Sequence, residues 1–83
     1  MYPVDTPQHL RTILRSLRQA KGLTQAQLGQ RLGVTQKRIA RIEAAPEVTA
    51  FDQISRMVTS LGCRLVIEEP APQKVTEPGA DTW

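Results

Sequence analysis

Cysteine and histidine are scarce in this 83-residue sequence, which holds one of each. A single cysteine excludes a disulfide within the chain, and His9 with Cys63 is too small a ligand set for a zinc site of the usual kind. A chain of this length buries only about 60–65% of its unfolded surface, so small domains without such cross-links often gain stability by association. We therefore expect an oligomer.

Long apolar runs are also missing. No stretch is long enough to span a bilayer, and the N-terminus carries no signal-peptide pattern. Cys63 has no evident base partner and is interpreted as a small apolar side chain, and no other pair of groups suggests catalysis. We therefore expect a soluble, cytoplasmic protein that is not an enzyme, binds no cofactor or metal and makes no membrane contact.

Acidic residues are absent from the segment between Thr6 and Ile42, although the whole chain contains eight of them. The basic residues of this segment are Arg11, Arg15, Arg18, Lys21, Arg31, Lys37, Arg38 and Arg41. The segment therefore carries +8 within a chain of formal net charge +3, which leaves −5 for the remainder. Such asymmetry indicates a face for a polyanion, although a solvated helix surface would show the same composition.

Capping residues and apolar spacing predict four helices. The first is capped by Thr6, has Pro7 at its first position and stops at Gly22. Its apolar stripe follows the spacing i, i+3, i+4, i+7. The stripe residues are Leu10, Ile13, Leu14 and Leu17. The fourth helix is predicted to be capped by Thr49 and to end at Gly62. Its stripe is Phe51, Ile54, Val58 and Leu61, with Met57 beside it.

The second and third predicted helices are short and lie close together in the chain. Thr24 and Gln27 form a capping box for the second, which runs to about Leu32, and Thr35 caps the third, which runs to about Ala44. Apolar residues that can point inward are Leu28, Leu32, Val34, Ile39 and Ile42. The outer face of the third helix then carries Thr35, Gln36, Lys37, Ala40 and Arg41.

Glycines at fixed spacing explain why one helix stops and another starts here. Gly29 lets the two helix backbones approach closely, and Gly33 tolerates the left-handed conformation that ends a helix. A stopped helix followed by a presented one is the helix-turn-helix arrangement, whose second helix enters the major groove of DNA. An ordinary helical hairpin with solvated charges is the simpler alternative. Glu43, Glu47 and Asp52 are expected to cap helices or to remain solvated.

In the C-terminal part of the chain the helical periodicity ends. Residues 63–68, "CRLVIE", alternate in the manner of a β-strand, and a lone strand leaves main-chain groups unpaired. We expect Leu65, Val66 and Ile67 to pair with a second copy, although the segment could instead pack on its own domain. From Pro70 onward the composition predicts disorder. The predicted organisation is an all-α domain with one such strand over residues 1–69, followed by a disordered tail over residues 70–83.

The segment "LTQAQLGQRLGVTQKRIARIE" resembles the Cro/C1-type (XRE) helix-turn-helix family, in which a Thr-Gln pair opens the second helix. The resemblance covers about residues 8–62 and implies a compact, lambda-repressor-like fold. A closer resemblance is to the HipB antitoxins, which pair with HipA-type kinase toxins. It rests on "ILRSLRQAKGLTQAQLGQRLGVTQKRI", on "AAP" and "TSLGCRLVI", and on a tail that ends in Trp83.

This resemblance implies roles for individual residues. Base contacts fall on Thr35, Gln36, Lys37, Ala40 and Arg41, with Gln36 suited to adenine and Lys37 or Arg41 to guanine. Phosphate contacts fall on Thr24, Gln25 and Arg38. The implied protein is a nucleoid-associated antitoxin and autorepressor that binds a palindromic operator as a homodimer and a HipA-like kinase toxin, with Trp83 as a toxin anchor. A stand-alone phage- or plasmid-type repressor and a protein-interaction adaptor are the alternatives.

Overall fold

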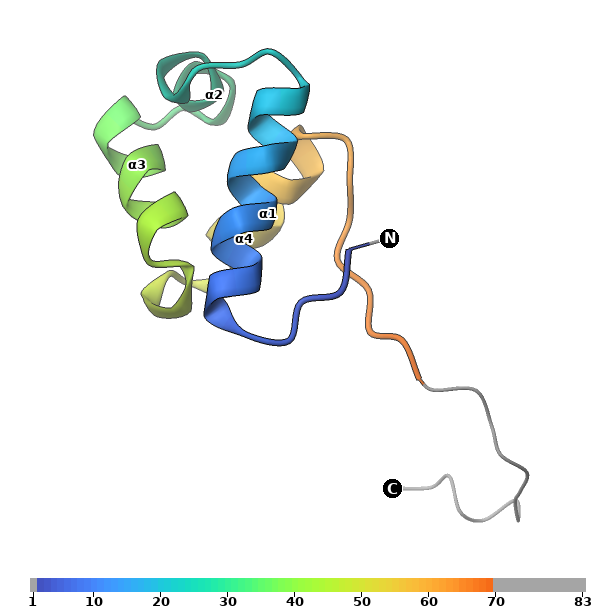
Figure 1. Cartoon of the computed structure of the whole chain (residues 1–83). Coiled ribbons are helices and arrows are strands. Elements are labelled where there is room, and N and C mark those ends of the chain that lie inside the picture. The colour runs from blue at the N-terminus through green and yellow to red at the C-terminus, as the bar shows by residue number, and fades with distance from the viewer. Residues whose placement is uncertain (1, 70–83) are drawn as a thin grey trace, which may run out of the picture.

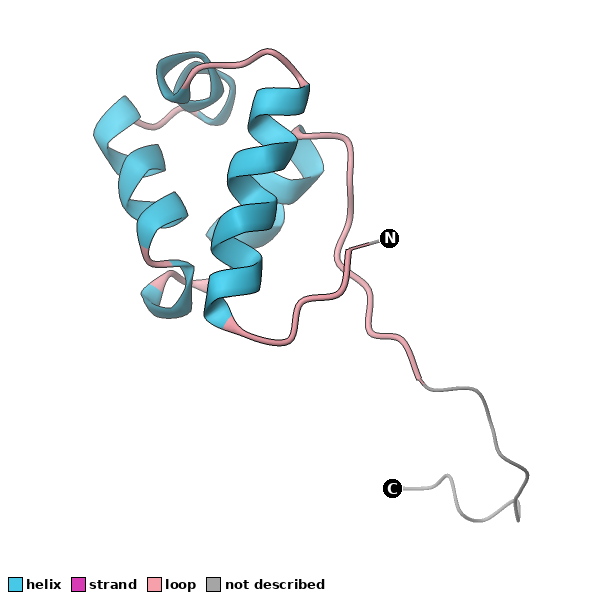
Figure 2. Ribbon diagram, in the orientation of Figure 1, coloured by secondary structure: helices cyan, strands magenta, loops and turns pink. Residues whose placement is uncertain are grey.

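The computed structural model describes residues 2–69 as a group of short helices followed by an extended segment (Figure 1). The elements, in chain order, are α1 (Pro7–Ala20), α2 (Gln25–Leu32), α3 (Gln36–Ala44), the 3₁₀ turn η1 (Pro46–Val48) and α4 (Phe51–Ser60). Figure 2 shows helices and connecting loops in this part of the chain. The all-α class predicted from the sequence is confirmed for the described residues.

Side-chain caps start the first three helices where the sequence predicts. The hydroxyl oxygens of Thr6, Thr24 and Thr35 each accept a hydrogen bond from the backbone N–H three residues on. At Thr24 the capping box is complete, since the side chain of Gln27 accepts from the backbone N–H of Thr24 at 2.9 Å. These bonds satisfy N–H groups that have no partner inside the helix, so local sequence fixes the three starts.

The start of α4 differs from the prediction. Its N-cap is Ala50, which offers no side-chain hydrogen bond, and Thr49 instead donates its hydroxyl hydrogen to the carbonyl oxygen of Ala45. The reason is the turn η1, which the sequence pattern does not predict and which uses Thr49 as its C-cap. Phe51, predicted in the apolar stripe, is 71% exposed because it is the first residue of the helix and lies beyond the core.

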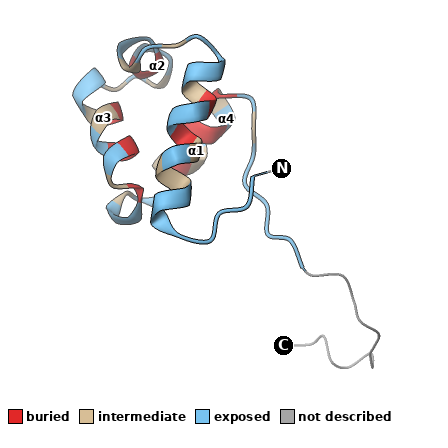
Figure 3. Cartoon of the chain, in the orientation of Figure 1, coloured by how far each residue is buried: buried red, intermediate tan, exposed pale blue. Residues whose placement is uncertain are grey.

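The core lies between the inward faces of all four helices (Figure 3). Its buried apolar residues are Leu14, Leu17, Leu28, Ile39, Ile42, Ile54, Met57, Val58 and Leu61. Partly buried residues packed against them are Leu10, Ile13, Leu23, Leu32, Val34 and Cys63. Except for Phe51, the apolar positions predicted for the helices therefore face this core, and Cys63 is an apolar packing residue as expected.

Close approach of backbones defines the turn between α2 and α3. A Cβ atom on Gly29 would lie 2.6 Å from the carbonyl oxygen of Val34, nearer than real Cβ atoms come. Gly33 has φ of +74°, which is the left-handed region that favours glycine. Both glycines are therefore needed at this turn, for the reasons that their spacing predicts.

The β-strand predicted over residues 63–68 is not formed in the single chain. Within the described residues, those from Arg64 to Glu69 make no hydrogen bond with the rest of the chain. An extended segment becomes a strand only when a neighbour accepts and donates main-chain hydrogen bonds, and the helical domain offers no such edge. The predicted division into residues 1–69 and 70–83 stays a prediction, since residues 70–83 lie outside the described part.

Candidate nucleic-acid interface

The front of α3 presents a row of polar and basic side chains to solvent. Gln36, Lys37 and Arg41 are exposed, and Ala40 between them is half-buried. Thr35 precedes them as the N-cap, and its hydroxyl oxygen accepts from the backbone N–H of Arg38 at 3.1 Å. All five residues predicted to face bases therefore border one helix face, which is opposite the buried residues of α3.

A buried ion pair holds the back of α3 against α1. The guanidinium of Arg18 donates from Nε to Oε2 of Glu43 at 2.5 Å and from an Nη atom to Oε1 at 3.2 Å. The side chains of Arg18 and Glu43 are only 11% and 1% exposed. A third bond runs from Arg18 to the carbonyl oxygen of Leu23 at 2.9 Å, so the loop before α2 is fixed as well. Parallel donors to one carboxylate give this pair a defined geometry.

The same carboxylate extends the network to the exposed face. Oε1 of Glu43 accepts from the side-chain amide of Gln25 at 3.1 Å. The amide oxygen of Gln25 in turn accepts from the amide nitrogen of Gln36 at 3.1 Å. A continuous chain of hydrogen bonds therefore links a buried carboxylate on α3 to the first residue of α2 and then to the first residue of α3.

A shallow hollow of about 680 Å³ lies beside the start of α2. Arg15 and Arg18 from α1 line it, together with Thr24, Gln25 and Gln36. The backbone N–H groups at a helix N-terminus and the exposed guanidinium of Arg15 favour an anion, whereas the charge of Arg18 is already paired with Glu43. Thr24 and Gln25, which the sequence assigns to phosphate contacts, therefore border a surface with the electrostatic character that a DNA phosphate needs.

Arg38 occupies a different position from the other predicted phosphate residues. Its guanidinium donates to the side-chain oxygen of Gln53 on α4, and its side chain is half-buried. Arg38 therefore ties α3 to α4, and its contact with phosphate stays a prediction.

The sequence pattern did not predict the roles of Glu43 and Arg18. Glu43 was expected to cap or remain solvated, and that prediction is wrong because the residue is buried against Arg18. A signal was available, since Glu43 follows the buried Ile39 by four positions and Ile42 by one. It therefore lies on the inward face of its helix.

The residues predicted for dimerisation are exposed. Leu65, Val66 and Ile67 are 39%, 59% and 98% exposed. Trp83, predicted as a toxin anchor, lies outside the described residues. Within residues 2–69 no group of three or more histidine, cysteine, aspartate and glutamate side chains could hold a metal ion. No helix in the same part is long and apolar enough to cross a bilayer.

Comparison with known proteins agrees with this geometry. A family model described as a helix-turn-helix domain matches residues 9–65, which include α2, α3, α4 and all but the first two residues of α1. The chain belongs to this helix-turn-helix family, a class of DNA-binding domain. No curated protein and no solved structure gave a significant match.

Proposed function

We propose that this protein is a sequence-specific transcriptional repressor that reads DNA with α3. The observation that carries the proposal is the hydrogen-bonded chain from Glu43 through Gln25 to Gln36. It orients a bidentate amide at the front of an exposed helix, where Lys37 and Arg41 form no salt bridge with the described residues. Amide and guanidinium groups of this kind form paired hydrogen bonds with base edges in the major groove.

Binding to DNA fragments tests the proposal directly. We expect footprinting to protect a palindromic site with half-sites about one or two helical turns apart. Replacing both Lys37 and Arg41 with alanine should abolish the preference for this site over random DNA. The matched control is alanine at Gln30, an exposed residue of α2, which should leave affinity unchanged. Equal binding of all sequences at moderate salt would exclude a specific repressor.

The finer function that we propose is that of a cytoplasmic antitoxin. It represses its own operon as a homodimer and neutralises a HipA-like kinase toxin by forming a complex. Support comes from the resemblance to HipB antitoxins and from the exposed apolar residues Leu65, Val66 and Ile67, which suit contact with another chain. The protein itself is proposed to be a binding module without catalytic activity.

A neighbouring gene for a kinase-like toxin would separate an antitoxin from a stand-alone repressor. With that toxin, calorimetry on the full chain and on a chain lacking residues 72–83 tests the proposed anchor Trp83. We expect weaker toxin binding after truncation, with operator binding nearly unchanged. Equal toxin affinity for both chains would exclude the anchor.

A further inference from the structure

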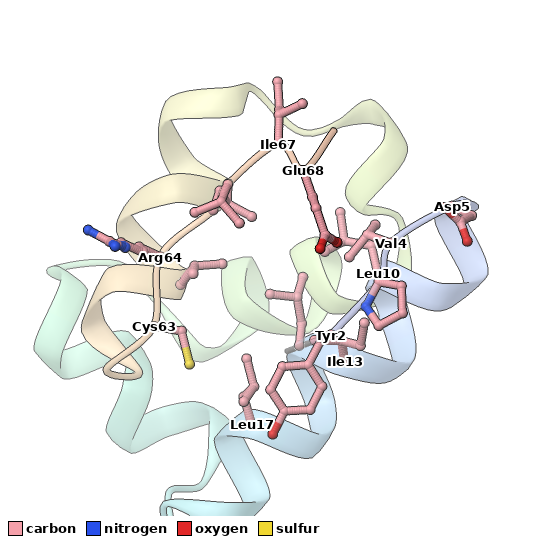
Figure 4. A pocket seen from close by; sticks show the side chains of 15 residues that line it. Tyr2, Val4, Asp5, Leu10, Ile13, Leu17, Cys63, Arg64, Ile67 and Glu68 are labelled. Carbon is pink, nitrogen blue, oxygen red and sulfur yellow. The ribbon is translucent and has the colours of Figure 1, made fainter. Parts of the chain in front are cut away.

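An apolar pocket of about 550 Å³ lies on the side of the domain away from α3 (Figure 4). Helix α1 supplies its floor through Leu10, Ile13 and Leu17. Residues 2–5 and residues 63–68, from opposite ends of the described chain, form its walls. Figure 4 shows Ile67 turned away from the other labelled residues, consistent with its exposure of 98%. Neither wall is covered by another described segment.

The occupant that best fits this surface is a second copy of the chain. We propose that residues 63–69 of two copies pair as antiparallel strands with the two-fold axis at Val66, so that Arg64 of each chain faces Glu68 of the other. This inference rests on the proposed homodimer and adds the register of its pairing. Within the described residues, Arg64 and Glu68 have no hydrogen bond or salt bridge in the single chain.

Symmetry restricts the possible registers. In a parallel pair the two-fold axis runs along the strands and places each residue level with its own copy but on the opposite face of the sheet, so neither Arg64 nor Glu68 would face a residue of opposite charge. In an antiparallel pair the two-fold axis is perpendicular to the sheet, so a given side chain lies on the same face of the sheet in both copies. Residues directly opposite one another must then both be even-numbered or both odd-numbered, because side chains alternate between faces.

Charge selects one of the remaining registers. Arg64 can oppose Glu68 only when the axis passes through Val66, and the alternation rule excludes Glu69 as its partner. With this axis, Leu65 opposes Ile67 and Val66 opposes itself, so every apolar residue of the segment has an apolar neighbour. An axis at Leu65 or Ile67 instead places an apolar residue opposite a charged one. The same register therefore satisfies both charge and hydrophobic pairing.

Charge reversal in the full chain tests the register. Arg64→Glu and Glu68→Arg should each weaken dimerisation roughly tenfold or more, because each creates two like-charge pairs. The double variant should return the dimer constant to within about threefold of the original. Glu69→Arg is the control, because it changes charge equally but lies opposite Cys63, and it should have a small effect. Sedimentation equilibrium measures all four, and failure of the double variant to restore dimerisation would overturn the register.

Disulfide trapping gives an independent test in a Cys63→Ser background. Val66→Cys should oxidise readily to a covalent dimer, since opposite Cα atoms lie about 4.5–5.5 Å apart, within disulfide reach. Leu65→Cys should not form a disulfide readily. Residue 65 of one copy lies opposite residue 67 of the other, so the Cα atoms of the two cysteines would be about 8 Å apart, beyond disulfide reach. Faster cross-linking of Leu65→Cys or Ile67→Cys would exclude the axis at Val66.

The results separate this inference from the proposed function. A protein that dimerises and binds its operator but fails both tests has a different register, and the repressor proposal stands. A protein that is monomeric at concentrations that saturate DNA overturns the register and the homodimer together. Loss of specific DNA binding, with dimerisation and cross-linking as expected, overturns only the repressor proposal.

Discussion

A buried glutamate, Glu43, lies behind the exposed face of α3 and is hydrogen-bonded to the side chains that border that face. Glu43 accepts hydrogen bonds from Arg18 and Gln25, and its side chain is 1% exposed. Removing one partner of a buried ion pair is costly because the other charge is left without compensation in a poorly solvated place. The residue therefore couples the stability of the domain to the orientation of Gln25 and, through it, of Gln36.

Replacing Glu43 with alanine should lower the free energy of unfolding by about 3–5 kcal/mol. The matched control is Glu47→Ala, since the Glu47–Arg11 pair is 3.8 Å apart with side chains 40% and 37% exposed. Exposed pairs contribute at most about 1 kcal/mol, so this variant should unfold nearly as the original does. Urea unfolding followed by circular dichroism measures both. A similar, small loss in both variants would show that the buried pair is not important for stability.

The hydrogen bond between Gln25 and Gln36 should make their contributions to DNA binding interdependent. Gln25→Ala removes the predicted phosphate contact and also frees the side chain of Gln36, so a double-mutant cycle should show a coupling of about 0.5–3 kcal/mol. Lys37 makes no hydrogen bond with Gln25, and a parallel cycle with Lys37→Ala should be nearly additive. Fluorescence anisotropy with operator DNA provides the affinities. Additivity in both cycles would mean that Gln25 does not orient Gln36.

At the scale of elements, the sequence predicted most helix boundaries correctly, but it did not predict the contacts between residues that are far apart in the chain. Threonine caps and glycine stops act within a few residues, which is why α1, α2 and α3 begin where the sequence predicts and why α1 and α2 end at their glycines. The ion pair between Arg18 and Glu43 joins residues 25 positions apart, and helix periodicity alone does not reveal it. The start of α4 was misplaced because the turn η1 takes Thr49, and the predicted strand lacks a partner within one chain.

The turn between α2 and α3 should be intolerant of a methyl group at Gly29. Alanine ordinarily favours a helix over glycine by about 1 kcal/mol. Here its Cβ would meet the Val34 carbonyl oxygen at 2.6 Å, and forced backbone shifts cost roughly 1–3 kcal/mol. We expect Gly29→Ala to lower stability and DNA affinity together.

Gln30→Ala serves as the control for this prediction, because Gln30 is the exposed neighbour of Gly29 in the same helix. Its stability should stay within about 0.5 kcal/mol of the original. Thermal unfolding compares the two variants. An unchanged or raised melting temperature for Gly29→Ala would show that α2 and α3 can move apart without a loss of stability.

At the scale of the molecule, the two proposed interfaces lie on different sides of the domain. The exposed residues of α3 and the start of α2 form the basic side, whereas the apolar pocket and residues 63–68 lie away from α3. A second copy on the apolar side would leave both basic sides free to meet one DNA duplex. Linking two half-site contacts raises the apparent affinity without any new contact, because the second binding event becomes intramolecular.

Val66→Pro should therefore separate dimerisation from DNA recognition. Proline removes a main-chain donor from the proposed strand pair, so sedimentation should show a monomer while the helices stay folded. The plot of log affinity against log salt has a slope proportional to the number of neutralised phosphates, so a monomer on one half-site should show about half the original slope. Val66→Ile, which keeps both the donor and the apolar side chain, should behave as the original protein. A Val66→Pro variant that remains dimeric with an unchanged slope would show that the two copies associate through another surface.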